Sequence, residues 1–315
     1  MPSDHAPQPH QKTLPLIAAI GNFDGVHVGH LSLLKETIAL AEQHNARAGA
    51  VVFDPHPRRF FRPDDPPFLI SSRSERERLL REAGAQEVLP LTFDAVLSSM
   101  TPDEFVAGIL KSRLGLHGVT TGSDFRFGKA RAGDVAMLGT LCAEHGLVFK
   151  AIDPVSDEGS DADGKVGSSA VRLAIAEGDV ERAAQLLGRY WTVRGVVQEG
   201  QRLGRTIDFP TANVSLGEVI HPANGVYAVS VNTPSAPRVP GVANFGRRPT
   251  VDGDTPLLEA HLFDFDQDLY GDEIDVSFLA FIRPEQKFPD ITALRKQIAL
   301  DAEEARRIHT TLAGQ

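Results

Sequence analysis

Short apolar runs alternate with helical patterns over the first half of the chain. The runs are LPLIAAI (14–20), AGAVVF (48–53), EVLPLTF (87–93), GVTTG (118–122) and LVFKAID (147–153). Between the first two, Leu31, Leu34, Ile38 and Ala41 repeat at helical spacing, which is typical of an amphipathic helix packed on a sheet. The alternation predicts βαβ units and a doubly wound parallel sheet, an α/β fold.

Helix boundaries in this half carry recognisable end signals. Ser72 with Glu75, and Thr101 with Glu104, have the spacing of capping boxes, and Pro102 occupies the first helical position of the second. Gly84 has the character of a helix C-terminal stop.

The pattern changes to strands separated by turns after residue 190. Six runs follow one another without intervening helices, namely WTVRGVVQ (191–198), TANVSL (211–216), GVYAVSV (225–231), VPGVANF (239–245), LLEAHLFDF (257–265) and EIDVSFLAFI (273–282). They predict a six-stranded antiparallel barrel, and the stretch 291–309 predicts an amphipathic C-terminal helix. We place a domain boundary near residue 186, giving domains 14–186 and 187–315, with residues 1–13 as a disordered tail.

Composition narrows the classes of function. The 315 residues carry a formal net charge of -10, which disfavours nucleic acid and anionic membrane surfaces as partners. Cys142 is the only cysteine, so no internal disulfide can form, and we expect a cytoplasmic protein. No window is apolar enough for a membrane-spanning helix. An acidic segment over 154–165 is expected to be a loop, and the oligomeric state stays open.

The stretch GNFDGVHVGH (21–30) joins the first predicted strand to the first predicted helix. Ligands of open parallel sheets bind beyond the carboxyl ends of the strands, where a helix N-terminus favours anions. His27 and His30 are three residues apart in the first turn and can face one anion. Two imidazole donors there would stabilise charge on the α-phosphate of a nucleotide. An isolated pair of this spacing is more often a surface or capping feature, and a metal site would need a third ligand.

A second candidate site follows in GQRLGRTIDFPTANV (200–214). Its loop with Gly204 and Arg205 offers backbone N–H groups to phosphates, and Thr211 and Asn213 are two apart on an extended segment. Their oxygens suit Mg²⁺ bound with ATP. Alternation along LLEAHLFDF places Glu259 among apolar side chains, which favours a functional carboxylate. The alternatives are an ordinary strand start for the first segment and a cross-strand salt bridge for Glu259.

The stretch 21–30 resembles the G-x-F-D-G-x-H-x-G-H signature of the nucleotidylyltransferase superfamily, in the version of bacterial bifunctional riboflavin kinase/FMN adenylyltransferases. FDPHPRRFF (53–61), TGSDFRFGKARAGD (121–134) and the segment 168–191 resemble later parts of that N-terminal domain. FPTAN (209–213), GVYAV, GVANFGRRPT, LEAHLFDFDQDLYG and FIRPEQKF resemble the riboflavin kinase domain. The resemblance implies phosphorylation of riboflavin to FMN in the second domain and adenylylation of FMN to FAD in the first, each with Mg²⁺ and ATP.

The resemblance also implies roles for individual residues. Glu259 would be the base that deprotonates riboflavin, and Thr211 and Asn213 would hold the metal. ATP would be bound by Gly21, Asn22, Phe23, Asp24, His27, His30, Ser168, Ser169, Arg172, Gly204, Arg205, Thr211 and Asn213. The flavin would be bound by His56, Pro57, Asp124, Phe125 and Arg283.

Two positions depart from the family pattern. Gly167 stands where the family has a hydroxyl residue, and Asp208 stands where it commonly has glycine. A carboxylate facing the phosphates would oppose ATP, so we expect Asp208 to point outward. Two alternatives to the bifunctional enzyme stay open at this point: a chain with only one of the activities, and a flavin-binding regulator without turnover.

Overall fold

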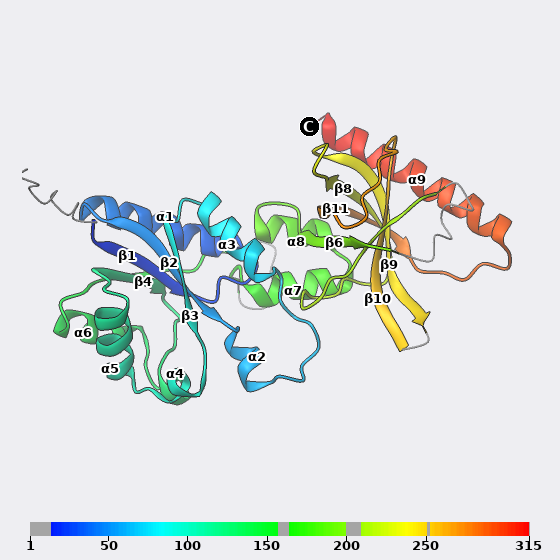
Figure 1. Cartoon of the computed structure of the whole chain (residues 1–315). Helices are drawn as coiled ribbons and strands as arrows, with labels where there is room; N and C mark the ends of the chain where they lie inside the picture. Colours follow the sequence, from blue (N-terminus) through cyan, green and yellow to red (C-terminus); the bar gives the residue numbers. More distant parts are fainter. Residues whose placement is uncertain (1–13, 157–163, 200–208, 251–252, 315) are drawn as a thin grey trace, which may run out of the picture. The chain divides into compact units, whose positions relative to one another are not determined.

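The computed structural model describes residues 14–156, 164–199, 209–250 and 253–314 (Figure 1). These residues form two compact units that interleave along the chain. The first unit comprises the chain up to Asn22 together with Leu31–Phe61 and Leu80–Pro154. The second comprises Phe23–His30, Arg62–Leu79 and the chain from Val155 onward. The predicted tail 1–13 lies outside the described residues.

A five-stranded parallel sheet forms the centre of the first unit (Figure 1). Its strands are β1 (Leu16–Gly21), β2 (Arg47–Asp54), β3 (Glu87–Thr92), β4 (Gly118–Gly122) and β5 (Val148–Ile152), in the order β3-β2-β1-β4-β5. They coincide with the five apolar runs of the sequence, so the predicted parallel sheet is confirmed. The order reverses at β1, which places the crevice between β1 and β4 where ligands of such sheets bind.

Helices cover both faces of this sheet. Alternate residues of β1 point in opposite directions: Leu16, Ala18 and Ile20 belong to the core beneath a π-helix (Phe105–Arg113) and α6 (Val135–Glu144). Ile17 packs on the other side with Leu40 of α1 (Val28–Gln43). The remaining helical segments are α2 (Pro57–Phe61), α3 (Arg73–Glu82), α4 (Ala95–Ser99), α5 (Pro102–Glu104) and a short 3₁₀ turn (Lys129–Arg131). The sheet is therefore doubly wound, as predicted.

The predicted capping box at Thr101 is complete, and the one predicted at Ser72 is half formed, because the Glu75 carboxylate accepts from Arg78 instead. Thr101 Oγ1 accepts from the Glu104 N–H at 3.3 Å, and the Glu104 carboxylate accepts from the Thr101 N–H at 2.8 Å, which completes the capping box. The Ser72 hydroxyl accepts from the Glu75 N–H at 3.2 Å. Gly84 follows α3 with φ of 102°. The π-type winding of 105–113 is a feature that no sequence signal predicted.

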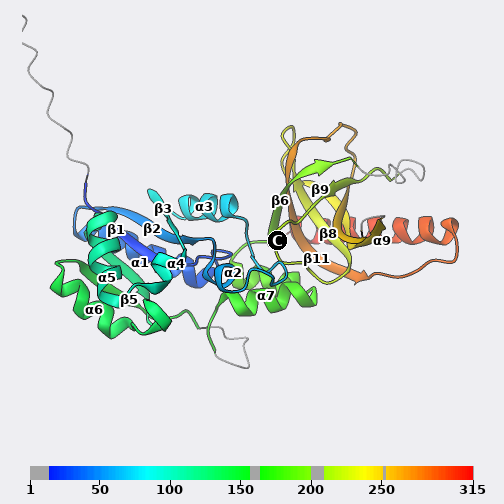
Figure 2. The ribbon, with the colours of Figure 1, turned by 60° about the horizontal axis from the view of Figure 1, so that its bottom comes forward.

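A closed antiparallel barrel of six strands dominates the second unit (Figure 2). The strands are β6 (Thr192–Gln198), β7 (Ala212–Val214), β8 (Gly225–Asn232), β9 (Val239–Thr250), β10 (Gly253–Leu262) and β11 (Glu273–Pro284). They close in the order β10-β7-β6-β11-β8-β9 around Val229, Leu258, Val276 and Phe278, all fully buried. The predicted barrel is confirmed.

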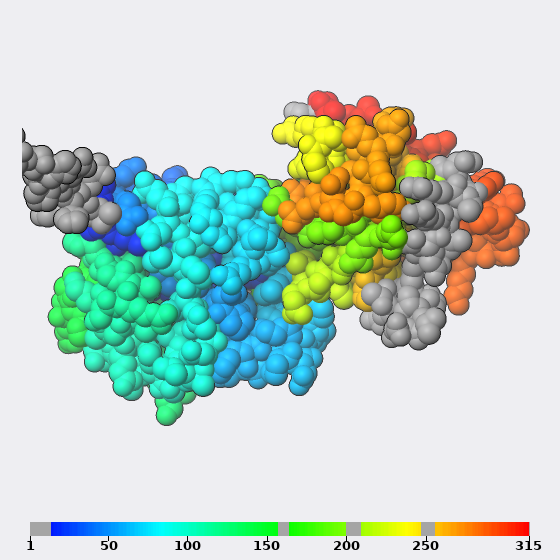
Figure 3. Space-filling view, in the orientation of Figure 1, coloured from blue at the N-terminus to red at the C-terminus, as the bar shows by residue number. Residues whose placement is uncertain are grey.

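Three helices pack against the barrel. Helices α7 (Ser168–Glu177) and α8 (Val180–Leu187) contribute Val171, Ile175 and Leu186 to the same apolar cluster as the barrel interior. The C-terminal helix α9 (Ile291–Ala313) packs on the outer face of the barrel through Ala305. Its C-terminal end is coloured red in Figure 3. This confirms the predicted terminal helix. Among the described residues, no helix is both long and apolar enough to cross a membrane.

Candidate active sites

The loop between β1 and α1 has an unusual backbone. Phe23, Gly25 and Val26 all have positive φ, of 52°, 80° and 41°. A Cβ on Gly25 would lie 2.6 Å from Cγ2 of Ile70, so this position requires glycine. Positive φ is rare for a β-branched residue such as Val26 and costs about 1–3 kcal/mol. Strain of this kind persists only where surrounding contacts hold it, and it concentrates at functional sites.

His27 and His30 stack against each other at the end of this loop. Their ring centroids are 3.7 Å apart and the planes are inclined by 19°. The His30 backbone N–H donates to His27 Nδ1 at 3.3 Å. With Nδ1 accepting, the neutral His27 ring carries its proton on Nε2 and can donate it to a ligand. A Cβ on Gly29 would lie 3.1 Å from the His27 ring, so glycine leaves room for this arrangement.

Both imidazoles are neutral. Burial, and after it the positive charges of Arg172 and Arg189, lower the pKa of His27 to about 4. The pKa of His30 is held well below its ordinary value by burial and then by His27 and the two arginines. The buried His30 Nδ1 has no hydrogen-bond partner within the described residues. The pair can therefore act as polar hydrogen-bonding groups next to an anion without carrying charge themselves.

Asp24 anchors the loop from within. It is 1% exposed, and its Oδ1 accepts from the backbone N–H groups of Ile70 at 2.9 Å and Ser71 at 3.3 Å. Its Oδ2 accepts from Arg172 Nη2 at 2.6 Å, while Arg172 Nε donates to the Phe68 carbonyl at 2.9 Å. Burial raises the pKa of Asp24, although Arg172 and the backbone donors lower it. These contacts make Asp24 the residue that orients Arg172.

The N-terminus of α7 approaches the same loop. Ser168 donates its hydroxyl to the Asp24 carbonyl at 3.0 Å, and Ser169 next to it is exposed. Gly167 occupies the N-cap position and makes no side-chain cap. The first N–H groups of α7 and its positive dipole end are therefore not neutralised by a capping side chain. Asp24, His27, His30, Ser168 and Arg172 thus gather around one loop.

The other predicted residues of this half lie at the carboxyl edge of the sheet in the first unit. Gly21 ends β1 and Asn22 follows it, while His56 and Pro57 follow β2. Asp124 and Phe125 follow β4, and the Phe125 ring stacks on Phe127 at 5.9 Å. After β2 and β3, Phe60 and Phe93 meet edge to face at 5.5 Å. The edge is rich in aromatic rings, which suits a flat apolar ligand.

The barrel carries a row of polar side chains on its outer face. The strand register pairs Glu259 of β10 with Asn213 of β7 on one side and with Asn244 of β9 on the other, and pairs Asn213 with Gln198 of β6. Opposite residues of paired strands project to the same side. Leu258 and Ala260, the neighbours of Glu259 along β10, point into the barrel core. Glu259 therefore faces outward with three amides in line.

A pocket of about 440 Å³ opens on this outer face. Barrel residues and α9 line it together, and they include Thr211, Val242, Asn244, Glu259, His261, Arg283, Phe288, Leu294, Ile298 and Asp301. Both the strands and the region of α9 contribute apolar and polar side chains to this lining. A pocket with an apolar wall and a few placed polar groups is typical of a small-molecule site.

Asn213 provides the clearest sign of a missing partner. It is 5% exposed, and its Oδ1 is buried without a hydrogen-bond partner in the described part of the protein. Leaving a buried acceptor unpaired costs about 1–3 kcal/mol. An amide oxygen is a ligand that Mg²⁺ accepts, so Asn213 and Thr211 fit a magnesium ion bound with ATP. No group of three or more His, Cys, Asp or Glu side chains within the described ranges could hold a metal on its own.

Arg283 is fixed at the edge of the pocket by α9. Its Nε and Nη2 donate to both oxygens of Asp301, at 2.8 and 2.7 Å. Gln297 Nε2 also donates to Asp301, at 2.9 Å, and the guanidinium lies 5.8 Å from the Phe288 ring centroid. A bidentate pair of this kind fixes the plane of the guanidinium.

Two family models match the chain, one on each candidate site. The model described as FAD synthetase matches residues 10–169, and the model described as riboflavin kinase matches residues 187–309. The bifunctional riboflavin kinase/FMN adenylyltransferase of Haemophilus influenzae is 38% identical over 290 residues, which are 91% of this chain and 92% of that protein. The chain belongs to the bifunctional riboflavin kinase/FMN adenylyltransferase family.

Other members of the bifunctional riboflavin kinase/FMN adenylyltransferase family match equally well in length. The protein of Pseudomonas fluorescens is 39% identical and covers 93% of this chain and 92% of its own. That of Bacillus subtilis is 32% identical over 99% of both chains. A solved structure from Streptococcus pneumoniae, described as a macrolide-efflux protein, is 31% identical, covers 94% of this chain and 95% of its own, and has a TM-score of 0.83. The predicted family and its two enzyme classes are confirmed.

Several residues that shape the two sites were not predicted from the sequence. Arg189 and Ser71 hold the loop of His27, while Asn244 and Asp301 line or support the barrel pocket. Strand register could have found Asn244, because it lies opposite Glu259. Gly204, Arg205 and Asp208 lie outside the described residues, so their predicted roles stay predictions.

Proposed function

We propose that the barrel pocket phosphorylates riboflavin and that the histidine loop adenylylates the FMN so formed. The proposal for the first reaction rests on one observation above all: Glu259 projects into a pocket beside the buried, unpartnered oxygen of Asn213. A base next to an oxygen-ligand site is the inventory that phosphoryl transfer from Mg·ATP needs.

In the kinase reaction, Glu259 accepts the proton of the ribityl 5′-hydroxyl. The hydroxyl oxygen forms a bond to the γ-phosphorus while the bond from that phosphorus to the β-bridging oxygen breaks, leaving ADP. Thr211 and Asn213 would hold Mg²⁺, which neutralises charge on the phosphates when it is bound. The apolar residues Leu294 and Ile298 would contact the flavin ring, and Arg283, which also lines the pocket, would contribute to flavin binding.

In the adenylyl transfer, a phosphate oxygen of FMN attacks the α-phosphorus of ATP. The bond between the α-phosphorus and the bridging oxygen breaks, and pyrophosphate leaves. The neutral His27, with its proton on Nε2, would donate to an α-phosphate oxygen, and His30 would act beside it. Preorganised donors of this kind stabilise developing charge without rearrangement. Arg172 and the N-terminus of α7 would bind the triphosphate.

His56, Pro57, Asp124 and Phe125 would bind FMN at the aromatic edge of the sheet, and Gly21, Asn22 and Phe23 would lie against ATP. We further propose domain limits of 14–186 and 187–315 and a cytoplasmic location. We also propose that neither nucleic acid nor a membrane is a partner of this protein.

The test is product analysis of the purified full chain incubated with riboflavin, ATP and Mg²⁺. The proposal predicts FMN first and FAD after it. Formation of FMN alone, or of FAD only when FMN is supplied, would mean that the chain has one of the two activities. Formation of neither FMN nor FAD would indicate a flavin-binding regulator without turnover.

A further inference from the structure

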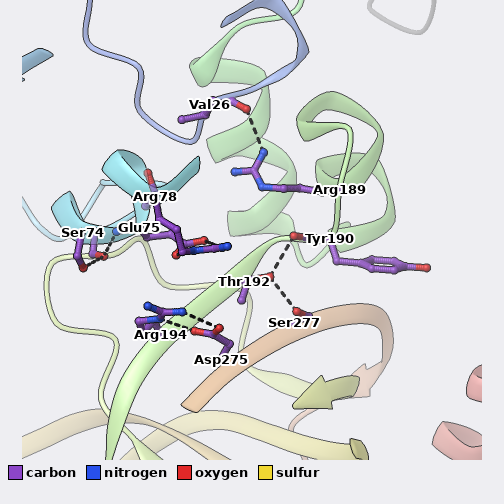
Figure 4. Close-up of polar contacts among 12 residues, drawn as sticks. Val26, Ser74, Glu75, Arg78, Arg189, Tyr190, Thr192, Arg194, Asp275 and Ser277 are labelled. Atoms are coloured by element: carbon purple, nitrogen blue, oxygen red, sulfur yellow. Dashed lines mark hydrogen bonds and ion pairs between the residues drawn. The ribbon is translucent and has the colours of Figure 1, made fainter. Parts of the chain in front are cut away.

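Arg189 links the start of the barrel to the histidine loop. It follows Gly188, the C-cap of α8, and lies three residues before the start of β6. Its Nη2 donates to the Gly25 carbonyl at 2.6 Å. Its Nη1 donates to the Val26 carbonyl at 3.0 Å, the contact drawn in Figure 4. Nη1 also donates to the Leu187 carbonyl at 3.2 Å. Arg189 lies in the part matched by the riboflavin kinase model, whereas the loop lies in the part matched by the FAD synthetase model.

The two carbonyls belong to the strained part of the loop. Gly25 and Val26 both have positive φ, and His27 follows directly. A guanidinium has five N–H donors in a rigid plane, so it can hold two successive carbonyls in one orientation, which an ammonium cannot do. Arg189 therefore fixes the backbone from which the His27 ring projects.

A second contact from the same segment reaches the loop indirectly. Trp191 is 2% exposed, and its Nε1–H donates to the Ile70 carbonyl at 2.9 Å. The N–H of Ile70 in turn donates to Asp24 at 2.9 Å. Arg189 thus holds the loop directly at Val26, and Trp191 holds it indirectly at Asp24 through Ile70.

We propose that Arg189 is a positioning residue for adenylyl transfer, which sets the loop of Gly25 and Val26 so that His27 faces the α-phosphate. The inference rests on the adenylyl transfer proposed above. Arg189, although it lies in the part matched by the riboflavin kinase model, would then act in adenylyl transfer. A single substitution at Arg189 should therefore lower FAD formation without affecting the kinase reaction.

The charge of Arg189 adds a second effect. The groups that face His27 are His30, Arg172, Arg189 and Asp24, which is bound to Arg172. Removing the Arg189 charge therefore raises the pKa of His27 toward its ordinary value, because one of the two positive charges that lower it is lost. Replacing arginine with lysine keeps the charge and removes only the paired contact.

The experiment compares Arg189→Gln and Arg189→Lys in the full chain, with Arg307→Gln as the control. Arg307 makes a comparable paired contact, to Glu304, on the exposed side of α9. Initial rates of FAD formation from FMN and of FMN formation from riboflavin are measured on each preparation across a pH series. The kinase rate of the same molecule reports whether the barrel is folded.

We expect Arg189→Gln to lower kcat of FAD formation by roughly 10²-fold, the cost of a misplaced catalytic group, with kinase kcat and KM unchanged. Arg189→Lys should also be impaired, because lysine restores the charge without the paired contact. The acid limb of the FAD-forming pH profile should move to higher pH in Arg189→Gln and stay in place in Arg189→Lys. Arg307→Gln should match the unmodified chain.

Three results would overturn the inference. They are full FAD formation by Arg189→Gln, complete recovery in Arg189→Lys, and an equal fall of both activities, which would make Arg189 a residue of general stability. A failure of the proposed function looks different, because the unmodified chain itself would then form no FAD from FMN.

Discussion

Glu259 lies directly opposite Asn213 in the register of β10 and β7, and both side chains project from the outer face of the barrel. Because strand pairing sets this relationship, the proposed base and the proposed metal ligand are both held by the hydrogen-bonded ladder between β10 and β7. A base on one strand and an oxygen ligand on the next can therefore act on the two ends of the same phosphoryl transfer.

Replacing Glu259 with glutamine should abolish proton acceptance while keeping size and polarity. We expect kinase kcat to fall by roughly 10²- to 10⁴-fold, the usual contribution of a general base. FAD formation from supplied FMN should be unchanged. Steady-state assays of both reactions check this, with Glu304→Gln on the exposed side of α9 as the matched control. Undiminished kinase turnover would remove Glu259 from the mechanism.

Asn213 should show a conflict between stability and activity. Because its buried Oδ1 has no partner, Asn213→Leu removes an unsatisfied acceptor and should leave the free energy of unfolding unchanged or raise it. The same change removes the proposed magnesium ligand, so KM for Mg·ATP should rise and kinase kcat should fall. Urea unfolding and kinase assays on one preparation measure both. An active Asn213→Leu protein would contradict the metal assignment.

Asp301 should matter for both stability and riboflavin affinity. Asp301 and Arg283 have side chains that are 5% and 19% exposed, so Asp301→Asn leaves a largely buried guanidinium without its carboxylate. We expect a loss of about 3 kcal/mol in the free energy of unfolding, as for other broken buried pairs, and a higher KM for riboflavin.

The matched control for Asp301 is Asp264→Asn. Asp264 pairs with Arg306 of α9, the helix that also carries Asp301, but the side chain of Asp264 is 82% exposed. Ion pairs at such positions contribute little, so the unfolding midpoint in urea should not change. Equal effects of the two substitutions would show that the burial of the Arg283 pair is irrelevant.

The neutral histidine pair predicts how stability depends on pH. The pKa of His27 is about 4 in the folded protein, and that of an unfolded chain is about 6.5. Between these values the unfolded chain binds the proton and the folded one does not. The free energy of unfolding should therefore fall as pH is lowered from about 6.5 to about 4, by on the order of 3 kcal/mol from His27.

His27→Gln should reduce this dependence, which urea unfolding across a pH series measures. The same substitution at His44, an exposed residue after α1, is the control. A pH dependence that is identical in His27→Gln and in the unmodified protein would show that His27 is not held neutral by the fold.

Hydrophobic periodicity predicted most of the architecture. The strands β1 to β5 are apolar runs because both faces of that sheet are covered, and the barrel strands alternate because only one face is interior. The winding of 105–113 as a π-helix was not predictable, because its residues also suit an α-helix. Nor was the packing of α7 and α8 with the barrel core, since an apolar helix face does not specify its partner.

Single residues were harder to predict than elements. Motif spacing indicated His27 and His30, which the structure shows stacked. Strand alternation and the family resemblance indicated Glu259, which lines a pocket. The contacts of Arg189, by contrast, span more than 160 positions to reach Gly25 and Val26. No local pattern encodes a contact at that separation. The positive φ of Phe23 and Val26 likewise runs against the ordinary preference of those residues.

If the barrel pocket and the histidine loop are two separate active sites, Glu259→Gln and His30→Asn should lose different products. Each protein is given riboflavin, and separately FMN, with ATP and Mg²⁺. We expect Glu259→Gln to form FAD from FMN at the normal rate but only traces of FMN from riboflavin, and His30→Asn to form FMN from riboflavin at the normal rate but only traces of FAD. Loss of both products in either variant, or retention of both, would contradict this expectation.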